Sequence, residues 1–258
     1  MSTWTKREDC GTNARIHTNR MEKEYHDQIT QAALNTCVYS DNVQLPGGKG
    51  AKAIMTNIAV VPTDSVTAII REASKYQQNK IAVMNFASFK YPGGAFLDGS
   101  MAQEEALCHK SFLYNVLEKQ SSFYEENQFK LDRGLYQNRA LYSPDILFFG
   151  DHKTVKCDVI TCAAPNRSVA ERYQKVSPEE NFSVLKSRIK FVLDIAEYNH
   201  VDTLIAGAFG CGVFRQDPIE VSNIFKELLE TENYNFINVI FAIPGGSNYE
   251  AFDATFNR

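Results

Sequence analysis

The chain alternates between short apolar runs and longer amphipathic stretches. The short runs have the length and flanking polar residues of buried strands, and they lie at residues 58–61, 80–86, 145–149, 157–163, 202–206 and 238–243. The amphipathic stretches have helical periodicity and lie at residues 21–38, 63–73 and 177–197. Strands that alternate with helices predict right-handed crossovers and a largely parallel sheet covered on both faces. We therefore expect a three-layer α/β fold.

A short segment after the second apolar run, residues 85–105, combines the end of a strand, a glycine turn and a helix start. Glycines at 93 and 94 follow Pro92 and allow the backbone to approach another group closely. Ser100 and Gln103 have the spacing of a capping box, which predicts Ser100 as the N-cap of the next helix.

Two adjacent acids, Glu104 and Glu105, follow in the first turn of this helix, which we expect to run to about Leu117. Acids are favoured there because they complement the helix dipole, by about 0.3–1 kcal/mol each, so capping alone accounts for them. Neighbouring residues do not share a helix face. The pair therefore cannot flank a glycosidic bond from opposite sides, as the carboxylates of ordinary glycosidases do.

A second glycine-rich loop, residues 207–214, follows the strand at 202–206. It alternates small residues with aromatic ones, which suits a diphosphate bound by backbone N–H groups and a ribose covered by a ring. A tight strand-to-helix turn is the alternative for this loop taken alone. Both loops, together with Pro165 and Asn166 (a ligand contact or an ordinary turn), lie at the carboxyl ends of predicted strands, where ligands bind in such sheets.

Composition and charge narrow the function classes. The chain is 44% hydrophobic and 22% charged, with a formal net charge of −4, which argues against binding along a nucleic-acid backbone by counterion release. No apolar stretch reaches membrane-spanning length, and the first ten residues lack a secretory signal pattern. The six cysteines and five histidines show no metal-ligand spacing, so we expect reduced thiols, no metal site and a cytoplasmic, soluble protein.

Taken together, these motifs resemble the catalytic signature of the poly(ADP-ribose) glycohydrolases, in particular the compact microbial type, which are macrodomain-fold enzymes. The chain supplies Asn-Phe-Ala-Ser at 85–88, Pro-Gly-Gly at 92–94 and Gln-Glu-Glu at 103–105. The resemblance continues through 107–114, 143–149, 157–166 and 207–218 and ends at 239–242. It implies a macrodomain-like catalytic domain at 46–258, preceded by an N-terminal helical extension at 1–45.

The chain departs from the family pattern where Ala95 replaces the third glycine of a triplet. A positive φ there would cost an alanine about 1–2 kcal/mol, whereas at negative φ the methyl group only lines the pocket. We expect a negative φ, because a strained alanine needs surrounding structure to hold it.

The resemblance also implies roles for individual residues. Glu105 is the catalytic acid, which protonates the leaving ribose oxygen, and Glu104 binds ribose hydroxyls beside it. The attacking water is held by the substrate's own diphosphate, and Phe214 packs against the distal ribose. The expected substrate-binding residues are Asn85, Ser88, Gly93, Gly94, Ala95 and Gln103 in the first segment, and Gly207, Phe209, Gly210, Cys211, Gly212, Val213 and Phe214 in the second.

The expected partners are ADP-ribose and poly(ADP-ribose) on modified proteins, with no cofactor, no nucleic acid and no membrane, and we expect a monomer. Two other functions stay open at the level of sequence. The chain could hydrolyse single ADP-ribose groups on protein side chains, or it could bind ADP-ribose without cleaving it, although such reader domains lack the Gln-Glu-Glu motif. Exo and endo cleavage are likewise not distinguished.

Overall fold

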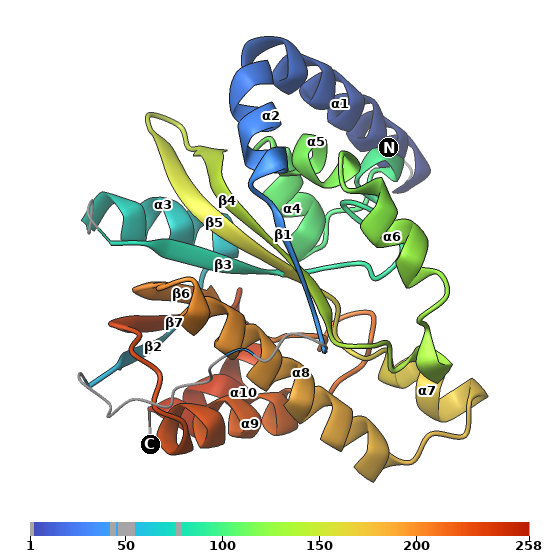
Figure 1. The fold of residues 1–258 in the computed structure, drawn as a ribbon, viewed down its shortest axis with the longest axis vertical. Helices are drawn as coiled ribbons and strands as arrows, with labels where there is room; N and C mark the ends of the chain where they lie inside the picture. Colours follow the sequence, from blue (N-terminus) through green and yellow to red (C-terminus); the bar gives the residue numbers. More distant parts are fainter. Residues whose placement is uncertain (1–2, 42–44, 46–54, 76–78, 258) are drawn as a thin grey trace.

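The computed structural model describes residues 3–41, 45, 55–75 and 79–257, and its centre is one seven-stranded mixed sheet (Figure 1). The strands are β1 (Cys37–Ser40), β2 (Asn57–Val61), β3 (Ile81–Phe86), β4 (Arg139–Phe149), β5 (Thr154–Cys162), β6 (Thr203–Ala206) and β7 (Asn238–Ala242), in the spatial order β1-β4-β5-β3-β6-β7-β2. β5, β3, β6, β7 and β2 run parallel, whereas β1 and β4 form an antiparallel edge.

Helices cover both faces of the sheet (Figure 1). One layer contains α1 (Thr3–Glu24), α2 (His26–Leu34), α3 (Ser65–Lys75), α4 (Gln103–His109), α5 (Leu113–Glu118) and α6 (Ser121–Asn127). The other contains α8 (Pro178–Tyr198), α9 (Pro218–Thr231) and α10 (Ser247–Phe256), with α7 (Arg167–Tyr173) at its end. The short helices η1 (Phe96–Asp98) and η2 (Asp132–Gly134) lie in connecting loops. Each layer has its own apolar core against the sheet, so the three-layer α/β prediction is confirmed.

Two helices of the second layer begin with a side-chain cap, a serine or an aspartate directly before a proline, as the sequence pattern favours. The Ser177 hydroxyl accepts a hydrogen bond from the N–H of Glu180, and the Asp217 carboxylate accepts one from the N–H of Ile219. In both helices proline occupies the first position, where its missing N–H costs nothing. These caps satisfy N–H groups in the first turns of α8 and α9, which have no partner within the helix.

The N-terminal region differs from the single helix predicted at 21–38. That stretch contains the end of α1, all of α2 and the edge strand β1, which pairs with β4. Tyr39 is buried in the core, and pairing with β4 gives this short strand a backbone partner that a helix pattern does not reveal. The division between an extension at 1–45 and a domain at 46–258 stays a prediction, since residues 42–44 and 46–54 lie outside the described part of the chain.

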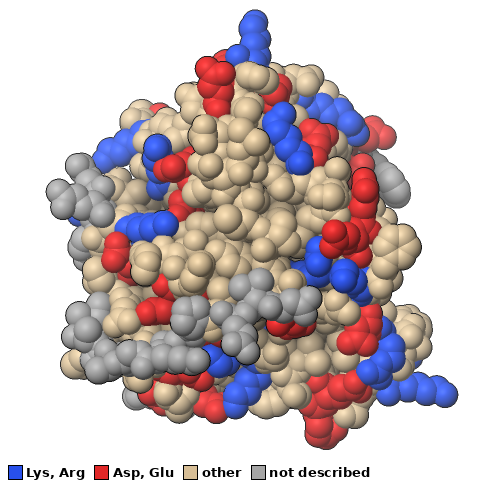
Figure 2. Space-filling view, in the orientation of Figure 1, with Lys and Arg blue, Asp and Glu red and all other residues tan. Residues whose placement is uncertain are grey.

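The distribution of surface charge and the character of the helices bear on what the chain can bind. On the face shown in Figure 2, basic and acidic side chains alternate, mostly around the margin of the view, as the small formal net charge of −4 leads one to expect. Among the described residues, no helix combines the length and apolar character needed to span a bilayer.

Candidate active site

The site begins where two parallel strands separate. β3 pairs with β6 only as far as Val83, so the C=O of Met84 and the N–H of Phe86 have no strand partner on that side. The side-chain amide of Gln103 fills the gap: its Nε2 donates to Met84 O at 2.8 Å and its Oε1 accepts from Phe86 N at 2.9 Å. Gln103 thus replaces a neighbouring strand and ties the start of α4 to the end of β3.

This contact explains why the predicted capping box is absent. α4 begins at Gln103, its N-cap is Ala102 with no side-chain cap, and Ser100 donates its N–H to Ala95 O instead. The Gln103 amide is engaged with the buried ends of β3, which have no other partner, so tertiary hydrogen bonds prevail over a local cap. The helix also ends earlier than predicted, at His109, and Ser111 just beyond it forms an isolated bridge with Phe148 of β4.

Glu104 is buried at 3% exposure and is held by two donors. Asn85 Nδ2 donates to its Oε1 at 3.2 Å, and the N–H of Ser88 donates to its Oε2 at 2.7 Å. Burial raises the pKa of Glu104 to about 8, with a further contribution from the Glu105 charge, and the two hydrogen bonds act against this shift. At neutral pH this carboxyl therefore retains a proton in the folded chain.

Glu105 is equally buried, at 5% exposure, but its two oxygens differ. Oε1 accepts a hydrogen bond from the N–H of Ala95 at 3.0 Å, whereas Oε2 has no partner among the described residues. One oxygen is thus fixed by the loop backbone, and the other is a buried polar atom that no described residue satisfies. A catalytic carboxylic acid needs an oxygen that is left without a protein donor in this way.

The glycine turn lies directly over the two acids. Gly93 and Gly94 both have positive φ, +66° and +62°. A Cβ atom on Gly94 would stand 2.7 Å from Oε1 of Glu105 and 2.9 Å from Oε2 of Glu104, so only glycine fits. Ala95 has φ −106°, which confirms the expected negative value. Its methyl group is accommodated without backbone strain.

A cavity of about 730 Å³ opens over the two glutamates. Ser88, Gly94, Ala95, Val213 and Phe214 of the predicted residues line it, together with Glu104 and Glu105. Smaller cavities of about 150 and 280 Å³ share lining residues with it or with each other, and Gln103, Phe209, Gly210 and Gly212 line the first of these. The three form a continuous series of hollows over the carboxyl ends of the parallel strands, large enough for a dinucleotide-sized ligand.

The loop at 207–214 contributes backbone groups to this series. Within the described residues, no hydrogen bond is donated by the backbone N–H of Gly210, Gly212 or Val213. These three N–H groups are therefore available to a ligand. Gly210 has φ +76° and packs against Ala164 and Gln216, so it also serves the turn itself. The two readings of this loop, anion binding and tight turn, are therefore compatible.

Several predicted contact residues are absent from the lining of the catalytic cavity. Asn85 is fully buried and supports Glu104, and Gly93 packs beneath Tyr114. Phe209 lines only the smaller cavity of about 150 Å³ and is otherwise buried, with its ring 5.7 Å from that of Phe86. Gly207 and Cys211 line none of the three cavities. Their predicted contact with substrate stays a prediction, and the structure gives each of the first three a supporting position.

Other lining residues had no signal in the sequence. Tyr136 stacks on Phe89 with ring centroids 4.3 Å apart and stands 6.1 Å from the ring of Phe214, and Arg15 reaches the cavity from α1. Both come from segments distant from the motifs. Tyr136 has a positive φ of 61°, which no local pattern predicts.

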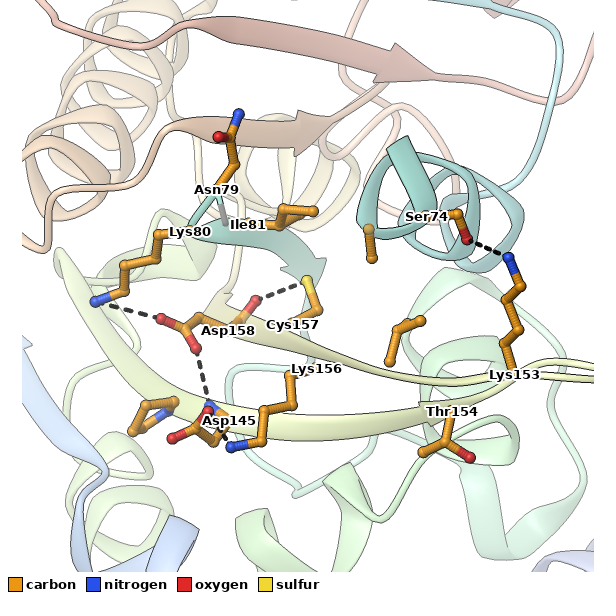
Figure 3. A pocket seen from close by; sticks show the side chains of 13 residues that line it. Ser74, Asn79, Lys80, Ile81, Asp145, Lys153, Thr154, Lys156, Cys157 and Asp158 are labelled. Carbon is orange, nitrogen blue, oxygen red and sulfur yellow. Dashed lines mark hydrogen bonds and ion pairs between the residues drawn. The ribbon is translucent and has the colours of Figure 1, made fainter. Parts of the chain in front are cut away.

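A second large cavity, of about 690 Å³, lies at the opposite, amino ends of β3 and β5 (Figure 3). Four of its charged side chains form two ion pairs, Lys80 with Asp158 at 3.5 Å and Lys156 with Asp145 at 3.0 Å. A further cation, Lys153, donates a hydrogen bond to the Ser74 hydroxyl at 3.4 Å. Parallel sheets bind ligands at the other, carboxyl edge. Nowhere in the described part of the chain do three His, Cys, Asp or Glu side chains come together as a metal site.

Comparison with known proteins finds matches of one kind. The model of the microbial-type PARG catalytic domain matches residues 8–151. The crystal structure of poly(ADP-ribose) glycohydrolase from Thermomonospora curvata is 27% identical, with a TM-score of 0.87 over 97% of this chain and 100% of that one. The same enzyme bound to the inhibitor ADP-HPD has a TM-score of 0.85 at 28% identity, again over 97% and 100% of the two chains.

The enzyme from Deinococcus radiodurans in complex with ADP-ribose is 30% identical, with a TM-score of 0.76 over 88% of this chain and 96% of that one. None of the curated proteins compared with the chain matches it in sequence.

Proposed function

This chain belongs to the microbial-type poly(ADP-ribose) glycohydrolase family, and on that premise we propose that it hydrolyses the ribose–ribose O-glycosidic bonds of poly(ADP-ribose) with Glu105 as the catalytic acid. The observation that carries the proposal is the asymmetry of Glu105. One oxygen is held by the N–H of Ala95, and the other is buried without a partner among the described residues, in a side chain that lines the cavity. A bound glycosidic oxygen would supply that partner.

The proposed chemistry is a single proton cycle. Glu105 donates its proton to the oxygen of the leaving ribose as the bond to the anomeric carbon breaks, and charge develops on the ring as an oxocarbenium ion. A water attacks the anomeric carbon and returns its proton to Glu105. Glu104, which receives hydrogen bonds from Asn85 and Ser88, accepts hydrogen bonds from the ribose hydroxyls or donates to them.

The remaining parts of ADP-ribose follow the series of cavities. We assign the distal ribose to the cavity over the glutamates, beneath the ring of Phe214. The diphosphate then lies along the N–H groups of 210, 212 and 213, which requires no basic side chain. This arrangement suits an acidic protein that binds one terminal unit of the polymer. The supporting residues Asn85, Gly93 and Gln103 act by positioning, while Ser88, Ala95 and Gly94 border the sugar.

The alternative of a reader domain is disfavoured by the intact pair of buried acids, because burying two carboxyls costs stability and a reader has no use for them. The unstrained φ of Ala95 removes one reason to expect a reshaped pocket for single ADP-ribose groups. A cytoplasmic location and a monomeric state remain proposals from the sequence.

Product analysis tests the proposal. The chain is incubated with poly(ADP-ribosyl)ated protein, and free ADP-ribose and the units left on the protein are measured, with Glu105→Gln as the matched inactive variant. We expect free ADP-ribose from the polymer and a residual single unit on the protein. Tight ADP-ribose binding without release from either substrate would show a reader, and complete removal of single units would show a mono-ADP-ribosyl hydrolase.

A further inference from the structure

The first helix of the chain lies against the catalytic loop along one stripe of side chains. Arg7, Gly11 and Arg15 are four residues apart and therefore share a helix face. Arg7 Nε donates to Asp98 O at 2.9 Å, and an Arg15 guanidinium nitrogen donates to Leu97 O at 3.4 Å. All three thus face η1, the short helix between the glycine turn and the acids.

The approach of the two backbones is unusually close. Gly99 has φ +78°, and a Cβ atom on it would lie only 2.0 Å from Arg7 O. A Cβ on Gly11 would lie 2.8 Å from Leu97 O. With glycine on both sides and Ala14 buried beneath, α1 is seated firmly, so Arg15 enters the cavity from a fixed helix.

Arg15 is well placed to bind an anion. It is exposed, its hydrogen bond to Leu97 O is long at 3.4 Å, and it forms no ion pair with a described residue. The charged residues that line the cavity are Arg15, Lys90, Asp98 and the two glutamates. Within the described residues, the guanidinium of Arg15 has a hydrogen bond only to a backbone oxygen, so its remaining N–H donors are available to an anion.

The position of Arg15 indicates which anion it binds. Val213 and Phe214 border both the catalytic cavity and the smaller cavity of the 207–214 loop, so that wall faces the ADP-ribose to be released. The catalytic cavity is also lined by Arg15, Leu97 and Asp98, and these three residues line neither of the two smaller cavities. The rest of the polymer lies beyond the glycosidic bond at Glu105. It must therefore leave the cavity on a side other than the one formed by Val213 and Phe214.

We propose that Arg15 binds the diphosphate of the ADP-ribose unit on the leaving-group side of the scissile bond, and that α1 thereby selects polymer over other ADP-ribosyl compounds. The inference rests on the proposed glycohydrolase function. A guanidinium offers paired N–H donors that match two phosphate oxygens, which a flexible lysine matches less well. Lys90, across the same cavity, adds charge but lacks this fork.

The test compares two substrates whose leaving groups differ in charge. One is poly(ADP-ribose), and the other is ADP-ribose joined at the same anomeric carbon to a neutral aryl alcohol. For Arg15→Gln we expect kcat/KM on polymer to fall about tenfold, the loss of one charge-assisted hydrogen bond. On the aryl glycoside we expect a change of less than about twofold, and Arg15→Lys should recover part of the loss on polymer.

The matched control is Arg20→Gln, an equal charge change on the same helix at a residue outside the cavity lining. It should leave both rates unchanged, which excludes a general effect of net charge. Equal activity of Arg15→Gln and Arg20→Gln on polymer would overturn the proposal. So would an equal loss on both substrates, because Arg15 would then act only through Leu97 and the catalytic loop. If the wild-type chain cleaves neither substrate, the proposed glycohydrolase function itself is wrong. This result can be told apart from the two results that would overturn only the role of Arg15.

Discussion

A Cβ atom on Gly94 would lie 2.7 Å from Oε1 of Glu105, the same oxygen that accepts the N–H of Ala95. The glycine turn and the catalytic carboxyl therefore form one packed unit. The turn holds the acid through a backbone N–H, and the acid excludes any side chain from the turn. The close approach that the glycines were expected to permit is thus an approach to the protein's own carboxyls.

Gly94→Ala should accordingly damage both stability and rate. The substitution places an L-residue at φ +62°, which costs about 1–2 kcal/mol, and pushes both glutamates from their positions. We expect a lower melting temperature and at least a tenfold loss of kcat, since small displacements of reacting groups cost about 10²-fold. Gly212→Ala is the control for stability, because nothing lies within 4 Å of its Cβ position. Equal melting temperatures of the two variants would contradict this account.

Glu105→Gln should abolish turnover while ADP-ribose binding survives. The amide keeps an oxygen for the N–H of Ala95 and a similar shape but has no acidic proton, and general-acid catalysis contributes about 10²–10⁴-fold. Release of ADP-ribose and its binding affinity are measured on the same preparation. A near-wild-type rate would show that another group protonates the leaving oxygen.

Glu104→Gln should change the pH dependence of stability. The pKa of Glu104 is raised from 4.5 to about 8, so between these values the folded chain holds a proton that the unfolded chain has lost. The free energy of unfolding of the wild type therefore falls as the pH rises, by at most about 1.4 kcal/mol per pH unit. Thermal melts from about pH 5 to pH 8 should show a shallower fall for the variant. Exposed Glu230 mutated to Gln is the control, and parallel curves for Glu104→Gln and wild type would reject the protonated state.

Glu104→Gln should also weaken productive binding of the ribose and reduce turnover. In the variant the amide NH₂ must face one of two donors, Asn85 Nδ2 or the N–H of Ser88, so one hydrogen bond of the support is lost. Both KM and kcat are measured. If both values are unchanged, Glu104 has no role in binding substrate and serves only as an acid at the start of a helix.

Ala95→Gly should leave stability almost unchanged or lower it by up to about 1 kcal/mol. The alanine sits at φ −106°, so glycine relieves no strain and only adds freedom to the unfolded chain. A thermal melt and kcat/KM on polymer are sufficient. A higher melting temperature would mean that the methyl group is strained in the native loop.

Phe214→Ala should reduce the rate more than the affinity for ADP-ribose. Phe214 lines the catalytic cavity, with its ring 6.1 Å from that of Tyr136, and we propose that it sets the distance between ribose and Glu105. A misplacement of about 1 Å costs about 10²-fold in rate. Phe129→Ala, at a ring that is 89% exposed, is the matched control. Proportional losses of rate and affinity would make Phe214 a simple binding residue.

The sequence by itself determined the alternation of strands and helices, the caps Ser177 and Asp217 and the identity of the acid pair. These features are local: a strand pattern, a cap or a motif is complete within about twenty residues, and the interactions that favour it act between near neighbours along the chain. The family resemblance added the order of the motifs, which separated Glu104 and Glu105 from ordinary helix-start acids.

Only the tertiary structure decided what surrounds those acids. Gln103 was expected to complete a cap beside Ser100, yet its amide satisfies the ends of β3, because β3 and β6 diverge after Val83. Arg15 reaches a loop more than eighty residues away along the chain. Burial, close approach and unpaired polar groups depend on which distant segments meet, and buried polar atoms bond to whatever partner the packing brings near, whatever the local pattern favours.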